Sequence, residues 1–149
     1  MTDQSISQQA EHLSRRRARA LPVLAIIFIS QQFAYFSDRP GAARTVDQVH
    51  IGAWLVLSVV ILLALTTGGG WIYSKEVRDL ANDEVTRSHR DSGFRFGFLA
   101  AMMGCVALYL VDLYKPMSGR DAIHLVMTIG VAAALLRFAY LELRALRDA

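Results

Sequence analysis

The amino-acid sequence predicts an all-helical, polytopic membrane protein with four transmembrane helices in an antiparallel bundle. The 149 residues include four long apolar segments of 17 to 25 residues, at about 20–36, 49–73, 96–114 and 122–140. A helix rises about 1.5 Å per residue, so about 20 apolar residues cross a hydrocarbon core of about 30 Å. The composition agrees, since 54% of the residues are hydrophobic. The segments are too long and too continuously apolar for barrel strands.

The basic residues lie mainly on one side of the four predicted spans. Twelve of the sixteen lysines and arginines fall within 1–19, 75–95 or 137–149, and only four fall in the two connections on the other side. Cytoplasmic segments carry the excess of Lys and Arg, so both termini and the 75–95 connection are predicted to be cytoplasmic. The net charge of +3 then indicates a flank of the cell inner membrane that faces anionic lipid, with no role in binding nucleic acid.

The chain is predicted to form one domain between a leader and a short tail. Residues 1–19 are polar and basic, 20–142 hold the four spans, and 143–149 form the C-terminal tail. The first span resembles a secretory signal in having basic residues before an apolar stretch. An uncleaved anchor fits better, because the leader is long and the small residues Gly41-Ala42-Ala43 lie well beyond the apolar stretch.

The connection 75–95 is the one substantial polar region between spans, and it is predicted to be a helical hairpin. Its acidic and basic residues nearly balance and include pairs spaced three or four apart, as in a solvated helix. We expect the second span to continue as a helix to about Leu80, and Asn82 to cap a helix that runs into the third span. The hairpin is either a solvated connector or a docking surface for a cytoplasmic protein, with these candidate residues: Asp83, Glu84, Arg87 and Arg90.

The same region carries a resemblance to a type of membrane protein. The run Asn82-Asp83-Glu84, followed by Arg87, Arg90 and then Phe94-Arg95-Phe96-Gly97, resembles the central segment of small uncharacterised four-helix bacterial inner-membrane proteins. The match covers about 35 residues and carries no catalytic residue with it. Some such proteins are encoded beside helix-turn-helix regulators, so the resemblance implies a regulatory partner.

Small residues predict where helices approach closely. Rows of small residues spaced four apart occur on the third and fourth spans: Gly97, Ala101 and Cys105; Ala100 and Gly104; Gly130 and Ala134. Such rows allow close backbone approach, either within one chain or between two copies of it. The run Thr66-Thr67-Gly68-Gly69-Gly70 predicts a loosened turn in the second span, which is either a hinge or a notch for close packing.

Few polar residues lie inside the spans, where ionisable groups would indicate transport or catalysis. Gln31 and Gln32, near the outer face, are suited to an interhelical hydrogen bond or to a substrate contact. His50 and His124 open the second and fourth spans at a depth similar to that of Asp112. Two histidines and a carboxylate are suitable ligands for haem or a divalent metal, and interfacial hydrogen bonding is the alternative role.

The sequence thus predicts an integral membrane accessory or interaction protein without catalytic activity and without a cofactor. No glycine-rich phosphate loop follows a strand, and no serine or cysteine is paired with a base. The expected partners are the lipid bilayer, a cytoplasmic protein and a second copy of the chain. One alternative is a small oligomeric transporter or channel, and a second is a haem or metal protein that uses His50 and His124.

Overall fold

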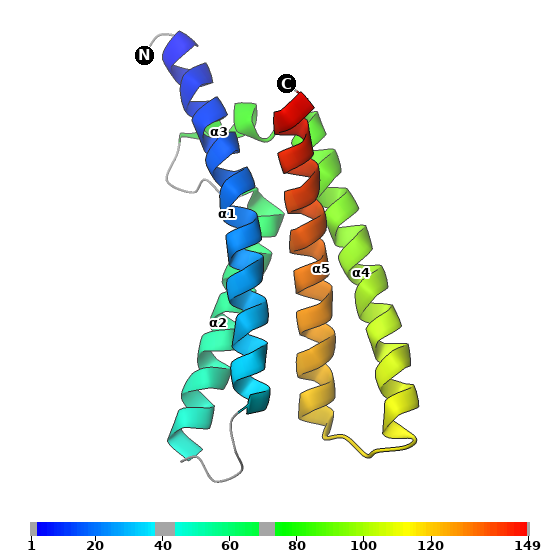
Figure 1. Cartoon of the computed structure of the whole chain (residues 1–149). Coiled ribbons are helices and arrows are strands. Elements are labelled where there is room, and N and C mark those ends of the chain that lie inside the picture. The colour runs from blue at the N-terminus through cyan, green and yellow to red at the C-terminus, as the bar shows by residue number, and fades with distance from the viewer. Residues whose placement is uncertain (1–2, 38–43, 69–73, 149) are drawn as a thin grey trace.

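The computed structural model describes residues 3–37, 44–68 and 74–148, and within these ranges every regular element is a helix (Figure 1). Helix α1 spans Asp3–Ser37, α2 spans Arg44–Thr67, α3 spans Lys75–Ala81, α4 spans Glu84–Asp112 and α5 spans Gly119–Asp148. The all-helical fold class is therefore confirmed. The four long helices run alternately in opposite directions, so the start of α1 and the end of α5 lie together (Figure 1). We call this the polar end, and the opposite end the far end.

Helix α5 is the central element, since it packs along both α1 and α4 and also contacts α2. The main core joins α1, α2 and α5 through buried residues spaced three, four or seven apart, as a helix stripe requires: Leu21, Ala25 and Phe28; Trp54, Ile61 and Leu65; Val131, Leu135 and Phe138. A second, smaller core joins Ala10 and Leu13 of α1 to Val77 and Ala81 of α3. The first 19 residues, predicted as a polar leader, are thus helical from Asp3 onward and hold α3 in place.

Two helices of the described chain, α4 and α5, are long and apolar enough to cross a membrane. The apolar stretch of α2, Ile51–Thr67, is shorter. Helix α4 buries few residues, all of them small or polar: Thr86, Gly93, Gly97 and Gly104. Its large apolar side chains are exposed, and Met103 and Tyr109 are each 68% exposed. An apolar surface of this extent indicates apolar surroundings.

The polar connection differs from its prediction in where the helices end. Helix α2 ends at Thr67, and Gly68 has a φ of +74°, which residues with a Cβ rarely adopt. The expected continuation of this helix to about Leu80 is wrong, because α3 is a separate helix that begins at Lys75. Residues 69–73, the last part of the predicted span, lie outside the described residues.

The N-terminal cap of α4 is also one residue away from its predicted position. Asp83 accepts a hydrogen bond from the backbone N–H of Thr86 at 2.8 Å, and this is the bond expected of a capping side chain. Asn82, the predicted cap, instead faces the end of α2, and its side-chain amide donates to the carbonyl of Thr67 at 3.4 Å. The connection therefore holds two helices, α3 and the start of α4, as predicted. The residue that caps the second of them is Asp83.

Helices α4 and α5 approach closely where small residues face each other. A Cβ on Gly97 would lie 2.6 Å from the carbonyl oxygen of Gly130 and 2.7 Å from the Cβ of Ala134. No side chain fits in that space without moving a backbone. This part of the predicted small-residue rows therefore serves packing within the chain, whereas Cys105 of the same row is exposed.

We expect Gly97→Ala to destabilise the protein by about 1–3 kcal/mol, the usual cost of overpacking a close contact. Gly52→Ala is the matched control, since Gly52 is also helical but has no atom within 4 Å of the added Cβ. The control should raise stability slightly, because alanine favours a helix over glycine by about 1 kcal/mol. Melting temperatures of the purified variants measure both effects, and equal temperatures would contradict the close contact.

Candidate functional site

A buried arginine organises the polar end of the molecule. Arg17 lies on α1 one turn after Leu13 and one turn before Leu21, so helical spacing places it on the buried stripe of that helix. Its side chain is 7% exposed, whereas the neighbouring Arg15 and Arg16 face outward. A guanidinium has five N–H donors and stays charged, so burial requires partners on several sides.

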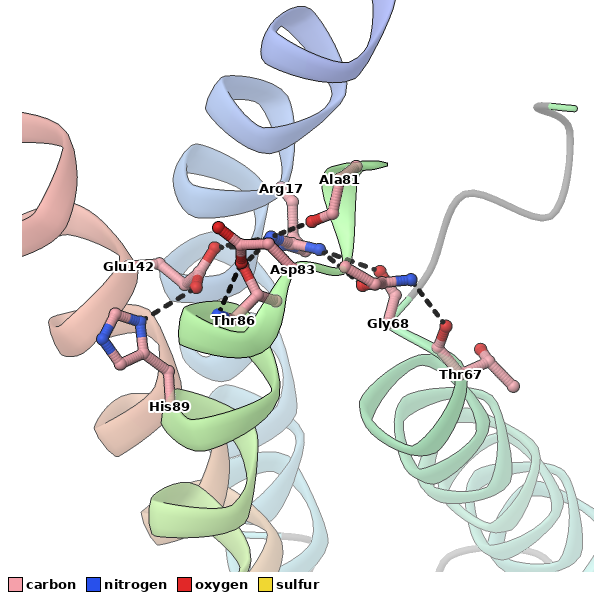
Figure 2. A network of polar contacts seen from close by, with 9 residues as sticks. Arg17, Thr67, Gly68, Ala81, Asp83, Thr86, His89 and Glu142 are labelled. Atoms are coloured by element: carbon pink, nitrogen blue, oxygen red, sulfur yellow. Dashed lines mark hydrogen bonds and ion pairs between the residues drawn. The ribbon is translucent and has the colours of Figure 1, made fainter. Parts of the chain in front are cut away.

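The negative partner of Arg17 is Glu142, in the last part of α5 (Figure 2). Both Nη2 and Nε of Arg17 donate to Glu142 Oε2, at 2.8 and 3.2 Å, and Glu142 is 5% exposed. The other carboxylate oxygen, Oε1, lies 3.1 Å from Nδ1 of His89 on α4. The guanidinium also lies over the ring of Phe138, 5.8 Å from its centroid. The carboxylate therefore joins α1, α4 and α5 in one contact.

The remaining donors of Arg17 bind the ends of two helices and the junction after them (Figure 2). Nη1 donates to the carbonyl of Gly68, directly after α2, at 3.4 Å, and Nη2 donates to the carbonyl of Ala81, the last residue of α3, at 3.2 Å. Carbonyls at helix C-termini lack intrahelical donors and carry partial negative charge, so a cation there is favourable. Asn82 Oδ1 at 3.0 Å and Thr86 Oγ1 at 3.1 Å complete the set.

The arrangement around Arg17 fixes the positions of the groups that it binds. Its partners are one carboxylate, two backbone carbonyls, one amide and one hydroxyl, all of which accept from the same guanidinium. We call this set, with His89, the Arg17 network. Because it contacts all five helices or their ends, it determines how the connection between α2 and α4 sits on the rest of the chain.

The four residues predicted for docking lie in or directly after this connection. Asp83, Glu84 and Arg87 are exposed, and Arg90 is half-buried. Asp83 has the additional structural role of capping α4. Arg87 Nε donates to the carbonyl of Asn82 at 3.1 Å, which holds the base of its side chain near the junction.

Two apolar side chains stand beside these charges. Leu80 of α3 is 57% exposed and Val85 of α4 is 55% exposed. We call the exposed side chains of Leu80, Glu84, Val85 and Arg87 the connection surface. It combines charge with exposed apolar area, and the Arg17 network lies directly beneath it.

Two of the candidate metal ligands, His124 and Asp112, line different clefts. His124 is 4% exposed and stacks on Trp54 with ring centroids 3.9 Å apart. Asp112 is exposed and accepts the backbone N–H of Met117 at 2.7 Å. His124 lines a cleft beside α2 and Asp112 lines another beside α4. The side chain of His50 lies outside those described, and among described residues no three His, Cys, Asp or Glu side chains could hold a metal ion.

The sequence analysis did not identify Arg17 as a buried residue with several hydrogen-bond partners. It counted Arg17 among the basic residues of the leader and gave no role to Glu142 or His89. The signal was present, since Arg17 stands four residues from Leu13 and Leu21, and Glu142 stands four residues after Phe138. A charged residue on an apolar stripe indicates a buried partner.

No family model, no curated protein and no solved structure matches this chain. The resemblance of the 82–97 region to four-helix membrane proteins therefore stays a prediction.

We expect Arg17→Met to lower the free energy of unfolding by about 3–5 kcal/mol, because it leaves the Glu142 carboxylate buried without its cation. Replacing both partners, Arg17→Met with Glu142→Leu, should recover part of this loss, since no charge is then left unpaired. Arg16→Met is the control on the exposed face of the same helix and should change stability by less than about 0.5 kcal/mol. Denaturant titration in detergent measures all three, and a loss with Arg16→Met equal to that with Arg17→Met would contradict the network.

Proposed function

We propose that this chain is a four-span protein of the cell inner membrane that has no catalytic activity and that docks a cytoplasmic protein through its polar end. The observation that carries the proposal is the Arg17 network, which holds an exposed, mixed apolar and charged surface in one position. A surface of fixed shape loses less conformational freedom on binding than a mobile loop does.

A membrane location is supported by what the helices expose. Helix α4 presents large apolar side chains on most of its faces and buries mainly glycines. In water this surface would cost free energy in proportion to its apolar area, whereas lipid chains satisfy it. Placing α1 and α2 in the membrane as well follows from their alternating direction beside α5 and from the exposed residues Ile26, Val56 and Val59.

The orientation follows from the basic residues and the polar end. Twelve of the sixteen lysines and arginines belong to segments at this end, so the positive-inside rule places it in the cytoplasm. The connection surface is then on the cytoplasmic side, together with both termini. A cytoplasmic protein with an apolar patch and charges complementary to Glu84 and Arg87 fits it.

Labelling of single cysteines in intact cells tests the orientation. In a Cys105→Ala background, Arg120→Cys at the far end should react with a membrane-impermeant maleimide, because that end faces outward. Ser88→Cys at the polar end should react only after the cells are permeabilised. Both Arg120 and Ser88 are exposed, so a difference reports the side of the membrane rather than burial. The reverse pattern would overturn the orientation.

Exchange of the connection surface tests the docking function. The variant carries Leu80→Ser, Glu84→Lys, Val85→Ser and Arg87→Glu, and it leaves Asp83 in place because that residue caps α4. We expect proteins cross-linked to the wild-type chain in native membranes to be lost from this variant. The melting temperature should change little, since exposed substitutions usually alter stability by less than about 0.5 kcal/mol each.

The control for this experiment reverses an exposed ion pair elsewhere at the same end. Arg144 and Asp148 lie 3.7 Å apart on the last turns of α5, and both are more than half exposed. Arg144→Asp with Asp148→Arg should keep the cross-linked proteins. An identical cross-linking pattern in the connection-surface variant would show that the connection is solvated and docks nothing.

A further inference from the structure

The outward face of α1 at the polar end carries a cluster of basic side chains. Arg15, Arg16 and Arg19 are exposed, and so is His12, one turn earlier in the helix. An open hollow of about 560 Å³ lies among these four side chains and Ala20. Its described lining includes no carboxylate. By charge, the ligand that suits this hollow is an anion.

The described chain neutralises this cluster only in part. Arg15 forms an ion pair with Glu11, one turn before it on α1. Arg16 and Arg19 form no ion pair with any described residue. Arg15 and Arg19 are also spaced four apart, a distance at which like charges destabilise a helix. An anion bound from outside the chain would remove this repulsion and supply the missing counter-charge.

The same face of α1 becomes apolar directly after the cluster. Helical spacing of three and four residues places Val23, Ile26 and Ile27 in line with Arg16 and Arg19. These three apolar side chains are 54%, 65% and 44% exposed, in chain order. From Arg19 to Val23 the helix rises only about 6 Å. The outward face of α1 thus presents cations and then apolar side chains within about one helical turn.

A phospholipid carries its groups in the same order, with a phosphate followed by hydrocarbon chains. We propose that this face of α1 binds one anionic phospholipid, whose phosphate lies on Arg16 and Arg19 and whose chains lie along Val23 and Ile26. The planar fork of a guanidinium matches phosphate oxygens, and basic pockets on the cytoplasmic side of membrane helices bind anionic headgroups. The inference rests on the proposed membrane location and is independent of the docking function.

Native mass spectrometry of the purified full chain in detergent tests the site. We expect dioleoylphosphatidylglycerol to bind to the wild-type chain as a retained adduct of one lipid. Dioleoylphosphatidylcholine has the same chains and phosphate, but its ammonium group compensates the charge, so it should bind at least about fivefold more weakly. Equal affinity for the two lipids, or no binding of dioleoylphosphatidylglycerol, would overturn the proposal.

Variants separate a site on α1 from the general charge of the polar end. Arg16→Gln with Arg19→Gln should weaken binding of the first dioleoylphosphatidylglycerol at least about tenfold, because two charged contacts are lost. Arg144→Gln with Arg147→Gln removes the same charge from exposed positions of α5, and it should change the affinity by less than about twofold. Equal losses in the two variants would mean diffuse attraction and would overturn the site.

Melting temperatures of the same variants test whether the arginines support the fold instead. Both pairs of residues are exposed, so each double variant should melt within about 2 °C of the wild type. A larger fall confined to the Arg16 and Arg19 variant would assign these side chains to the fold and would overturn the proposal.

Competition distinguishes a lipid from other anions. Glycerol phosphate carries the phosphate without chains, so it should not displace the bound lipid even at about hundredfold excess. A short single-stranded DNA should not displace it either. Displacement by one of these compounds would assign the arginines to a free phosphate or to nucleic acid, and would overturn the proposal. The assay changes no residue of the connection surface and needs no membrane orientation, so its failure is distinguishable from failure of the docking and labelling experiments.

Discussion

The charge of Arg17 is the constraint around which the polar end is built. A cation held away from water requires compensation on every side, and the chain supplies it to this residue of α1 from the four other helices or their ends. The ends of α2 and α3 meet at this guanidinium, and the start of α4 follows directly from the junction. Short, irregular connections between helices are usually the least ordered parts of a bundle. Here four described residues at the helix ends of the connection accept hydrogen bonds from Arg17 alone, and this contrast makes the connection a suitable surface for recognition.

The two ends of the core differ in how their buried polar atoms are hydrogen-bonded. At the polar end the buried donors and acceptors satisfy one another within the chain. At the far end the amide of Gln32 and the indole of Trp54 are buried without such partners among the described residues. Between them lies an apolar core of α1, α2 and α5. Helix α4 takes no part in that core beyond Phe94, and it is held to α5 through glycines, so most of its large apolar side chains stay exposed.

The sequence was informative wherever the structure depends on neighbouring residues. Apolar length predicted the four long helices, and the balanced charges of 75–95 predicted the helical connection. Prediction from the sequence failed where contacts between residues distant in the chain determine the local structure. The end of α2 depends on Gly68 meeting Arg17 and Asn82, and no local pattern around residue 68 contains those partners. His124 and Asp112 line different clefts, and this depends on how α5 is rotated against α2 and α4, which spacing alone does not give. Arg17 could not be told apart by sequence from its basic neighbours, because all three of them are exposed: Arg15, Arg16 and Arg19.

The distance along the chain between Arg17 and Glu142 has a consequence for synthesis. The two residues are 125 positions apart, so the arginine emerges from the ribosome about 6–25 s before the carboxylate at usual translation rates. Every apolar helix is complete, or nearly so, before the ion pair forms. The junction after α2 can therefore reach its final geometry only when the last turns of α5 have been made. A nascent chain that stops before residue 142 keeps its apolar helices but lacks this closing contact, so the ion pair forms only after most of α5 has been made.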